Sequence, residues 1–180
     1  MSSEQLQELH EGAEHARHDP DKVPVSFTMA VLAVLVATVA LLGHRAHTEE
    51  ILTQTRVTDQ WAYYQAKTIR RHNDQMFVDM SAFLDPKDPG QLARLREKYA
   101  SEAERYSKEQ KDLEADARKL EEETRLWRRR TDYYDLAEVL LEVSLIITSI
   151  TLLSEKRGFW YAGIFIALAG SAVALGGVVG

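Results

Sequence analysis

The sequence predicts an all-α integral membrane protein with three transmembrane helices and a long antiparallel, coiled-coil-like helical hairpin between the first and the second. Three charge-poor apolar blocks are each about long enough to cross a hydrocarbon core of roughly 30 Å as a helix. A long polar insert, residues 44–135, separates the first block from the second. Four prolines and nine glycines among 180 residues leave long stretches without helix breakers, so the insert can be helical too.

The composition excludes several classes of function. The net charge of −6 argues against nucleic acid as the main partner, because phosphate binding requires a cationic face. The chain has no cysteine, which excludes disulfides and thiolate metal sites. No nucleophile–base pairing, glycine-rich phosphate loop or closed metal signature is present. We therefore expect no catalysis, no cofactor and no small-molecule substrate.

Residues 1–24 form a polar, acidic tail that contains histidines. Glu11, His15 and His18 follow one another at four- and three-residue steps, as on one helical face. Imidazole and carboxylate groups could together ligate zinc or another divalent ion. Nothing apolar anchors the segment, however, and a proline at position 20 ends any helix there. A solvated tail is therefore the favoured interpretation over a metal site.

Residues 25–43 form the first predicted transmembrane helix. The block carries no charge, and it is not a typical cleavable signal peptide, because an acidic segment precedes it and no small-residue cleavage site follows. Alanines recur along it at three- and four-residue steps, which lets helices approach closely. The same step continues into the insert, and we expect this stripe to face the second arm: Ala30, Ala33, Ala37, Ala40, His44, His47, Ile51, Thr55, Thr58, Ala62, Gln65, Ile69, His72 and Met76.

The insert, residues 44–135, is predicted to be the helical hairpin, with its turn at residues 85–90 (DPKDPG). This break divides it into two arms of nearly equal length. In the second arm, large residues recur every seven positions, which keeps one stripe on one face of a supercoiled helix. The stripe runs into the second apolar block, which predicts one unbroken helix: Leu92, Tyr99, Tyr106, Leu113, Leu120, Trp127, Tyr134 and Leu141.

Three aromatic residues, Trp61, Tyr63 and Tyr64, stand in the polar first arm. Aligning the two arms places Trp61 opposite residues 113–120, where the small Ala117 leaves room for an indole. Trp61 and Tyr64 share a helical face, whereas Tyr63 points elsewhere and could contact a second subunit or another partner. The alternative that all three pack within one chain is favoured, because aromatic stripes at helical spacing are usually core.

Residues 136–153 and 159–179 are predicted to be the second and third transmembrane helices, joined by a tight turn. Glu138 and Glu142 lie on one face of the second helix, and charges within a span are costly. The hairpin alignment places this face near His44, with three further residues around it. A proton or cation relay is one interpretation, and interfacial ion pairs that hold the helices in register are the favoured one. The neighbouring residues are His47, Arg45 and Tyr134.

The residues beside and within the spans bear on orientation and assembly. A tryptophan and three arginines at residues 127–130 are typical of a membrane interface. Cations near the span ends nearly balance between the two sides, and we expect a cytoplasmic hairpin. Small residues in the third span suit close helix contacts, so self-assembly is a further expectation.

Two stretches carry a resemblance to a known family. LLGHRAHTEEILTQTRVTDQWAYYQAKTIR, after the first span, and YYDLAEVLLEVSLIITSITLLSEKRGFWYAG, near the end, resemble an uncharacterised family of bacterial membrane proteins known as domain of unknown function 4337. The resemblance covers nearly the whole chain. It implies a multi-pass protein of the bacterial inner membrane and brings no activity, cofactor or catalytic residue.

These observations favour a non-enzymatic membrane-anchored hairpin protein that acts as an assembly, spacer or accessory subunit. Its expected partners are the lipid bilayer and either a second copy of itself, as a homo-oligomer, or another membrane protein complex. The alternative is an oligomeric proton or cation pathway that uses Glu142 and Glu138 with His44 and His47. A metal-responsive tail that signals to the hairpin is a third possibility.

Overall fold

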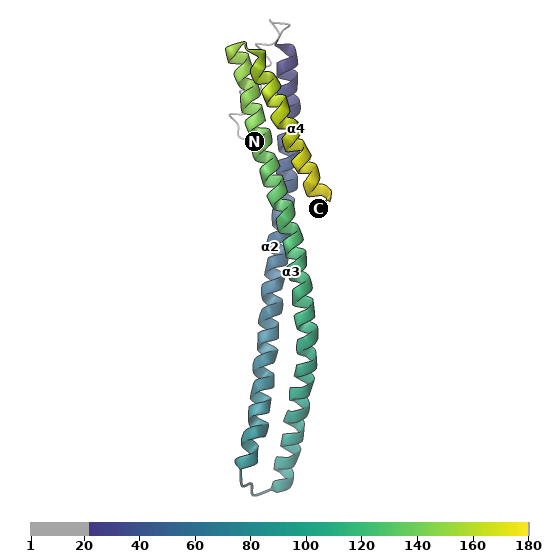
Figure 1. Cartoon of the computed structure of the whole chain (residues 1–180). Coiled ribbons are helices and arrows are strands. Elements are labelled where there is room, and N and C mark those ends of the chain that lie inside the picture. The colour runs from purple at the N-terminus through teal and green to yellow at the C-terminus, as the bar shows by residue number, and fades with distance from the viewer. Residues whose placement is uncertain (1–21, 180) are drawn as a thin grey trace. The chain divides into compact units, whose positions relative to one another are not determined.

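The computed structural model describes residues 22–179, and within that range it contains helices and no strand (Figure 1). Its elements are α2 (Val23–Met80), the short 3-10 helix η1 (Ser81–Phe83), α3 (Pro89–Ser154) and α4 (Arg157–Val179). The all-α expectation is therefore confirmed for this range. Helices α2 and α3 have 58 and 66 residues, so each runs without a break through an apolar block and a polar arm.

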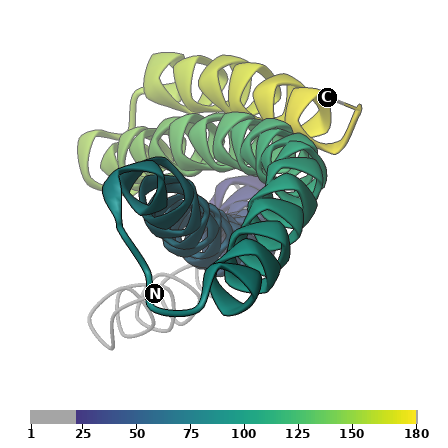
Figure 2. The same cartoon turned by 90° about the horizontal axis from the view of Figure 1, so that it is seen from below.

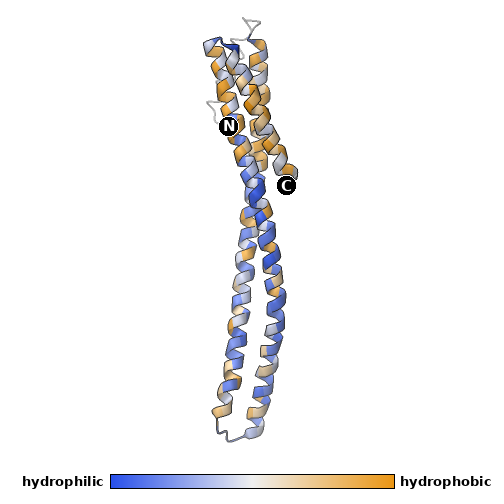
Figure 3. Cartoon of the chain, viewed as in Figure 1, coloured by the Kyte–Doolittle hydropathy of each residue, from blue (hydrophilic) through white to orange (hydrophobic). Residues whose placement is uncertain are grey.

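The chain divides into two compact units. Of the described residues, 22–50 and 126–179 form one unit, here called the bundle unit, and Ile51–Arg125 forms the other, the arm unit. Figure 3 shows that hydrophobic residues dominate the helices of the bundle unit and that hydrophilic residues dominate the arm unit. The sharp change in hydropathy along α2 and α3 follows from the block structure of the sequence.

The bundle unit packs three helical segments around an aliphatic core. Leu32, Val36 and Val39 of α2 are buried in the same cluster as Leu141 and Leu145 of α3. Two views show α4 beside the last part of α3 (Figures 1 and 2). Polar contacts add to this packing, because Ser144 Oγ donates to the Gly163 carbonyl at 2.9 Å and Trp160 Nε1 donates to Thr28 Oγ1 at 3.1 Å.

Two glycines allow α4 to lie close to α3. A Cβ atom at Gly163 would overlap the Thr148 hydroxyl and would lie 3.1 Å from the Ser144 carbonyl oxygen. A Cβ atom at Gly170 would lie 3.1 Å from the side chain of Leu141. Glycine at these positions therefore lets the backbones approach more closely than alanine would.

The three helices of the bundle unit are long and apolar enough to cross a membrane, by length and composition. Their outward faces carry large apolar side chains: Phe27 is 70% exposed, Phe165 is 75% exposed and Leu175 is 66% exposed. A surface of this kind is costly in water and suited to lipid. The bundle unit therefore indicates membrane association.

In the arm unit, the face of α2 that turns inward is not the stripe expected from the sequence. The residues expected to face the second arm, Ile51 through Met76 at three- and four-residue steps, are exposed. Thr53 and Val57 are buried instead, and the half-buried Trp61 and Tyr64 continue the inward line. The physical reason is the fit against α3, because this face brings Trp61 to Glu121 and Lys67 to Glu109.

The inward face of α3 in the arm unit has a line of small or polar residues at its centre. Ala103, Gln110 and Ala117 are buried, with Ala117 completely enclosed. The larger side chains of the seven-residue stripe, such as Tyr106 and Leu113, lie half-buried beside them. Small central residues leave room for large side chains from α2.

The ends of α3 follow helix-capping rules. Asp88 Oδ1 accepts hydrogen bonds from the backbone N–H groups of Gly90 and Gln91 at 2.9 and 3.0 Å, and Pro89 occupies the first helical position. Helix α3 thus begins inside the expected turn at residues 85–90. At its other end, Glu155 has a φ of 56°, a left-handed conformation that reverses the chain before α4.

Candidate functional site

Trp61 joins the two helices of the arm unit through a hydrogen bond and a ring contact. Its Nε1 donates to Glu121 Oε1 at 2.9 Å. Its ring meets Tyr64 edge-on, with centroids 5.4 Å apart and an interplanar angle of 79°, a preferred aromatic geometry. Glu121 lies one helical turn beyond the enclosed Ala117. The indole therefore contacts α3 at Glu121, one residue beyond the stretch 113–120 to which the alignment of the arms assigned it.

Lys67 contacts one carboxylate and two aromatic rings in the arm unit. Its side chain is 13% exposed and its Nζ lies 2.5 Å from Glu109 Oε2. The same Nζ lies 4.8 Å from the ring centroid of Tyr106 and 5.3 Å from that of Tyr63. The hydrogen bond with Glu109 raises the pKa of Lys67, and the reciprocal hydrogen bond lowers the pKa of Glu109. Both groups thus remain charged across the neutral pH range.

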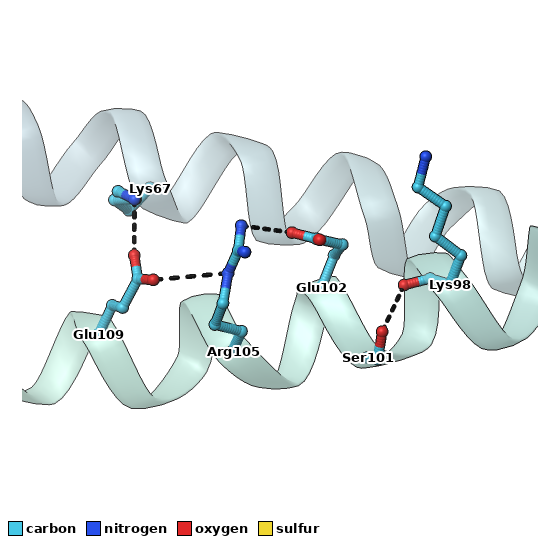
Figure 4. A network of polar contacts seen from close by, with 6 residues as sticks. All are labelled: Lys67, Lys98, Ser101, Glu102, Arg105 and Glu109. Carbon is cyan, nitrogen blue, oxygen red and sulfur yellow. Dashed lines mark hydrogen bonds and ion pairs between the residues drawn. The ribbon is translucent and has the colours of Figure 1, made fainter.

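Figure 4 shows how Glu109 is held from two sides. Lys67 approaches it from α2, and Arg105 Nε lies 3.5 Å from its Oε1 from one turn back on α3. Arg105 also pairs with Glu102, which extends the network along α3. A charged network with shared members holds each side chain in place at a smaller entropic cost than isolated surface pairs.

Two further contacts extend the pairing towards the turn. Gln110 Nε2 donates to Thr68 Oγ1 at 2.5 Å, and the rings of Phe77 and Tyr99 lie 4.4 Å apart. Along the line Trp61–Glu121, Thr68–Gln110 and Phe77–Tyr99, the residue numbers rise on α2 while those of the partners on α3 fall.

Sequence reasoning missed Lys67, Thr68, Glu109 and Gln110 as contact residues. Gln110 had a usable signal, because a long amide at a central seven-residue position must find a hydrogen-bond partner when buried. Lys67 and Glu109 had none, since charged residues on a helix are usually solvated. The remaining expected contact residues of α3 lie half-buried along its inward stripe: Tyr99, Tyr106, Leu113, Leu120 and, in the bundle unit, Trp127.

The members of the polar cluster expected at the second apolar block differ in their exposure. Glu138 and Glu142 are half-buried, whereas His44, Arg45 and His47 are exposed. His47 Nδ1 lies 3.9 Å from Glu50 Oε2 on its own helix. Within residues 22–179, no hydrogen bond or ion pair joins either glutamate to His44, Arg45 or His47.

Tyr134, the sixth member of that expected cluster, is buried and serves packing. A Cβ atom at Gly43 would lie 3.3 Å from its Cβ, and one at Gly177 would lie 3.2 Å from its Cε1. The ring thus fills the space where α2, α3 and α4 come together. Beside it lies a cavity of about 600 Å³ with Arg45 and Arg130 in its walls.

A second polar feature that sequence reasoning missed is a buried column on α3. Ser144 and Thr148 are completely buried, and Thr151 is 5% exposed. Thr148 Oγ1 donates back to the Ser144 carbonyl at 2.8 Å. Hydroxyls that bond within a helix or to its neighbour lower the cost of placing polar side chains in an apolar bundle.

The candidate metal ligands Glu11, His15 and His18 lie outside the described residues. In the part of the chain that is described, no group of three or more histidine, aspartate or glutamate side chains is arranged to hold a metal ion.

Fold and site together define a class of protein: within residues 22–179 the chain is helical without strands, with three helices able to cross a membrane by length and composition and with two polar arms. The chain belongs to the family described as Domain of unknown function (DUF4337), whose family model matches residues 21–180. This confirms the resemblance drawn from the two quoted stretches. No curated protein and no solved structure matches the chain.

Proposed function

We propose that this protein is a non-enzymatic, multi-pass membrane protein whose arm unit is an antiparallel, coiled-coil-like hairpin that makes protein contacts. It acts as an assembly, spacer or accessory subunit in the bacterial inner membrane, with the hairpin on the cytoplasmic side. The observation that carries the proposal is the line of contacts from Trp61–Glu121 through Lys67–Glu109 to Phe77–Tyr99. Such contacts hold two helices together, and none of them forms a reaction centre.

The outward face of α2 supports self-assembly as the mode of contact. Residues 51 through 76 at three- and four-residue steps are exposed and carry no formal charge: Ile51, Thr55, Thr58, Ala62, Gln65, Ile69, His72 and Met76. Ile69 is 61% exposed and Met76 is 47% exposed. In a chain with 28% charged residues, an uncharged stripe of this length favours a helix partner over water.

A second copy of the chain fits this stripe. Copies inserted in one membrane in the same orientation would bring α2 against α2 in parallel, so each stripe residue meets its own counterpart. Because the stripe has no charge, this arrangement creates no like-charge repulsion. The inward faces of α2 and α3 keep their contacts with each other within one chain.

The mass of the complex in mild detergent tests the proposal. We expect the parent chain to purify as an oligomer and the double variant Ile69→Glu/Met76→Glu to purify with a smaller mass. Placing two carboxylates opposite their copies makes the contact repulsive. The double variant Ala93→Glu/Ala115→Glu, which adds the same charge at exposed positions of α3, is the control and should keep the parent mass.

Contrary results have definite meanings. A monomeric parent that brings down another membrane protein would replace self-assembly with a hetero-complex. A monomeric parent with no co-purifying chain would contradict the assembly role.

The runner-up function, an oligomeric proton or cation pathway, is favoured by one observation. Glu138 and Glu142 lie half-buried in an apolar stretch of α3, and intramembrane carboxylates commonly mark ion paths. Proton or cation flux into liposomes that contain the parent protein would establish this pathway if the flux is lost when the parent is replaced by Glu142→Gln. The absence of flux from the folded parent would remove it.

A further inference from the structure

The cavity in the bundle unit lies where the apolar blocks meet the first charged residues. Its walls come from all three helices: Leu42 and Arg45 on α2, Trp127 and Arg130 on α3, and Val178 on α4. Its volume of about 600 Å³ is large enough for a small organic group rather than a single water molecule. The cavity is therefore a structural feature with room for a ligand.

The charge of the cavity wall favours an anion. Arg45 and Arg130 contribute two positive charges, and Glu49 contributes one negative charge. Within residues 22–179, neither arginine makes an ion pair or a donated hydrogen bond. Two guanidinium groups facing one space without carboxylate partners leave a net positive site.

Arg130 carries the strongest sign that an acceptor belongs here. Its Nε is shielded from solvent and has no hydrogen-bond partner. Its guanidinium lies 5.0 Å from the ring of Trp127, a cation–π contact that fixes the group in place. A buried donor left without a partner costs about 1–3 kcal/mol, so an acceptor in the cavity would recover that cost.

The rest of the wall narrows the chemistry of the ligand. Leu42, Tyr134 and Val178 offer apolar surface next to the two arginines. The planar guanidinium fork matches the oxygen spacing of phosphate better than it matches a monatomic anion. Tryptophan and arginine side chains at this position along a membrane helix lie at the depth of lipid headgroups.

We propose that this cavity binds a phosphate group, and that the group belongs to the headgroup of an anionic phospholipid whose acyl chains lie along the apolar faces of the bundle unit. Arg45 and Arg130 hold the phosphate oxygens, and Trp127 keeps Arg130 in position. The lipid source rests on the membrane placement proposed above, whereas the phosphate chemistry rests on the cavity alone. A phospholipid headgroup and free inorganic phosphate share this chemistry.

Native mass spectrometry of the purified full chain tests the site. The protein in mild detergent is titrated with phosphatidylglycerol, and retained lipid is counted for each chain, so the result does not depend on the oligomeric state. We expect Arg45→Gln/Arg130→Gln to weaken retention by about tenfold or more, since hydrogen bonds to charged groups are the strong ones. The control Arg128→Gln/Arg129→Gln removes the same charge at exposed positions of the same stretch but outside the cavity, and its loss of lipid should be clearly smaller than that of the cavity variant.

Two further measurements complete the experiment. Arg130→Lys keeps the charge but loses the fork, so we expect partial retention, and circular dichroism of each variant checks that its helices are intact. Displacement of the lipid by millimolar inorganic phosphate supports the phosphate chemistry. Equal lipid retention by the cavity variant and its control, together with phosphate binding that depends on the two arginines, would overturn the lipid source. Equal lipid retention without such phosphate binding would overturn the site itself.

Discussion

At the scale of single residues, Lys67 shows how a charged side chain becomes part of a helix contact. Its methylene stem is covered, its ammonium group pairs with Glu109, and the rings of Tyr63 and Tyr106 lie near the charge. Aromatic faces attract a cation electrostatically, so the four groups support one another. Tyr63 remains 51% exposed, which leaves part of its ring available to a partner.

The Lys67–Glu109 pair makes stability depend on pH in a defined direction. The pKa of Glu109 is lowered, chiefly by its hydrogen bond with Lys67, so its contribution is present above its ordinary pKa of 4.5 and is lost as the pH falls through the lower folded value. The pKa of Lys67 is raised from 10.5, chiefly by its hydrogen bond with Glu109, so its contribution is present below 10.5 and is lost as the pH rises through the higher folded value.

We therefore expect Glu109→Gln to lower the Tm of the full chain in detergent at pH 7, and the difference from the parent to shrink as the pH is lowered below 4. Thermal melts followed by circular dichroism measure both effects. Glu104→Gln is the matched control, because Glu104 pairs with Lys108 on an exposed face where both side chains are at least 70% accessible. A Tm loss equal to that of the control would contradict the role given to the pair.

At the scale of helices, close packing between α3 and α4 depends on glycine at one position and not at another. Gly163 faces the Thr148 hydroxyl and the Ser144 carbonyl, whereas a Cβ atom at Gly158 would meet nothing within 4 Å. The two glycines belong to the same helix, so a comparison between them separates packing from helix propensity.

We expect Gly163→Ala to destabilise the chain by about 1–3 kcal/mol, because the added methyl group must push the helices apart. Gly158→Ala should be neutral or slightly stabilising, because alanine is the better helix former by roughly 0.5–1 kcal/mol. Equilibrium unfolding in mixed micelles, followed by tryptophan fluorescence, measures both. Equal effects of the two substitutions would show that α4 does not pack on α3 through Gly163.

Much of the helical architecture could be read from the sequence, because block hydropathy and the scarcity of glycine and proline determine it. The inward face of α2 could not. The alanine steps of the first apolar block continue into the arm as Ile51, Thr55 and Thr58, but the structure turns Thr53 and Val57 inward. These two residues lie two positions after Ile51 and Thr55, about half a helical turn round the axis, so in a weakly amphipathic helix only the fit against a partner helix selects the inward face.

The parts of the candidate site that depend on residue size could be predicted from the sequence. The parts that depend on pairs of charged residues could not. Trp61 donates to Glu121, one helical turn from the small Ala117, and residue size is visible in the sequence. Predicting the pairing of Lys67 with Glu109 requires the exact register between two helices. Predicting the cavity beside Tyr134 requires the relative positions of three helices. Contacts between distant parts of a chain depend on such registers, which single-sequence patterns do not specify.

At the scale of the whole molecule, one chain of the DUF4337 family contains an apolar bundle unit and a polar arm unit. The three helices able to cross a membrane support the proposal that the protein is multi-pass. The arm unit has two surfaces that bear on this proposal: a closed inward face and an uncharged outward stripe on α2. The proposed function depends on the two arms pairing along their length.

Cysteine cross-linking in native membranes tests this claim most directly, because the parent chain contains no cysteine. In Thr68→Cys/Gln110→Cys the two thiols replace side chains that touch. In Ile69→Cys/Lys111→Cys each thiol stands one residue further along its helix, at an exposed position. If the arms pair, we expect mild oxidation to cross-link the thiols at positions 68 and 110 within one chain and to leave the thiols at positions 69 and 111 free. Equal cross-linking of both pairs, or none in the first, would contradict the paired arms.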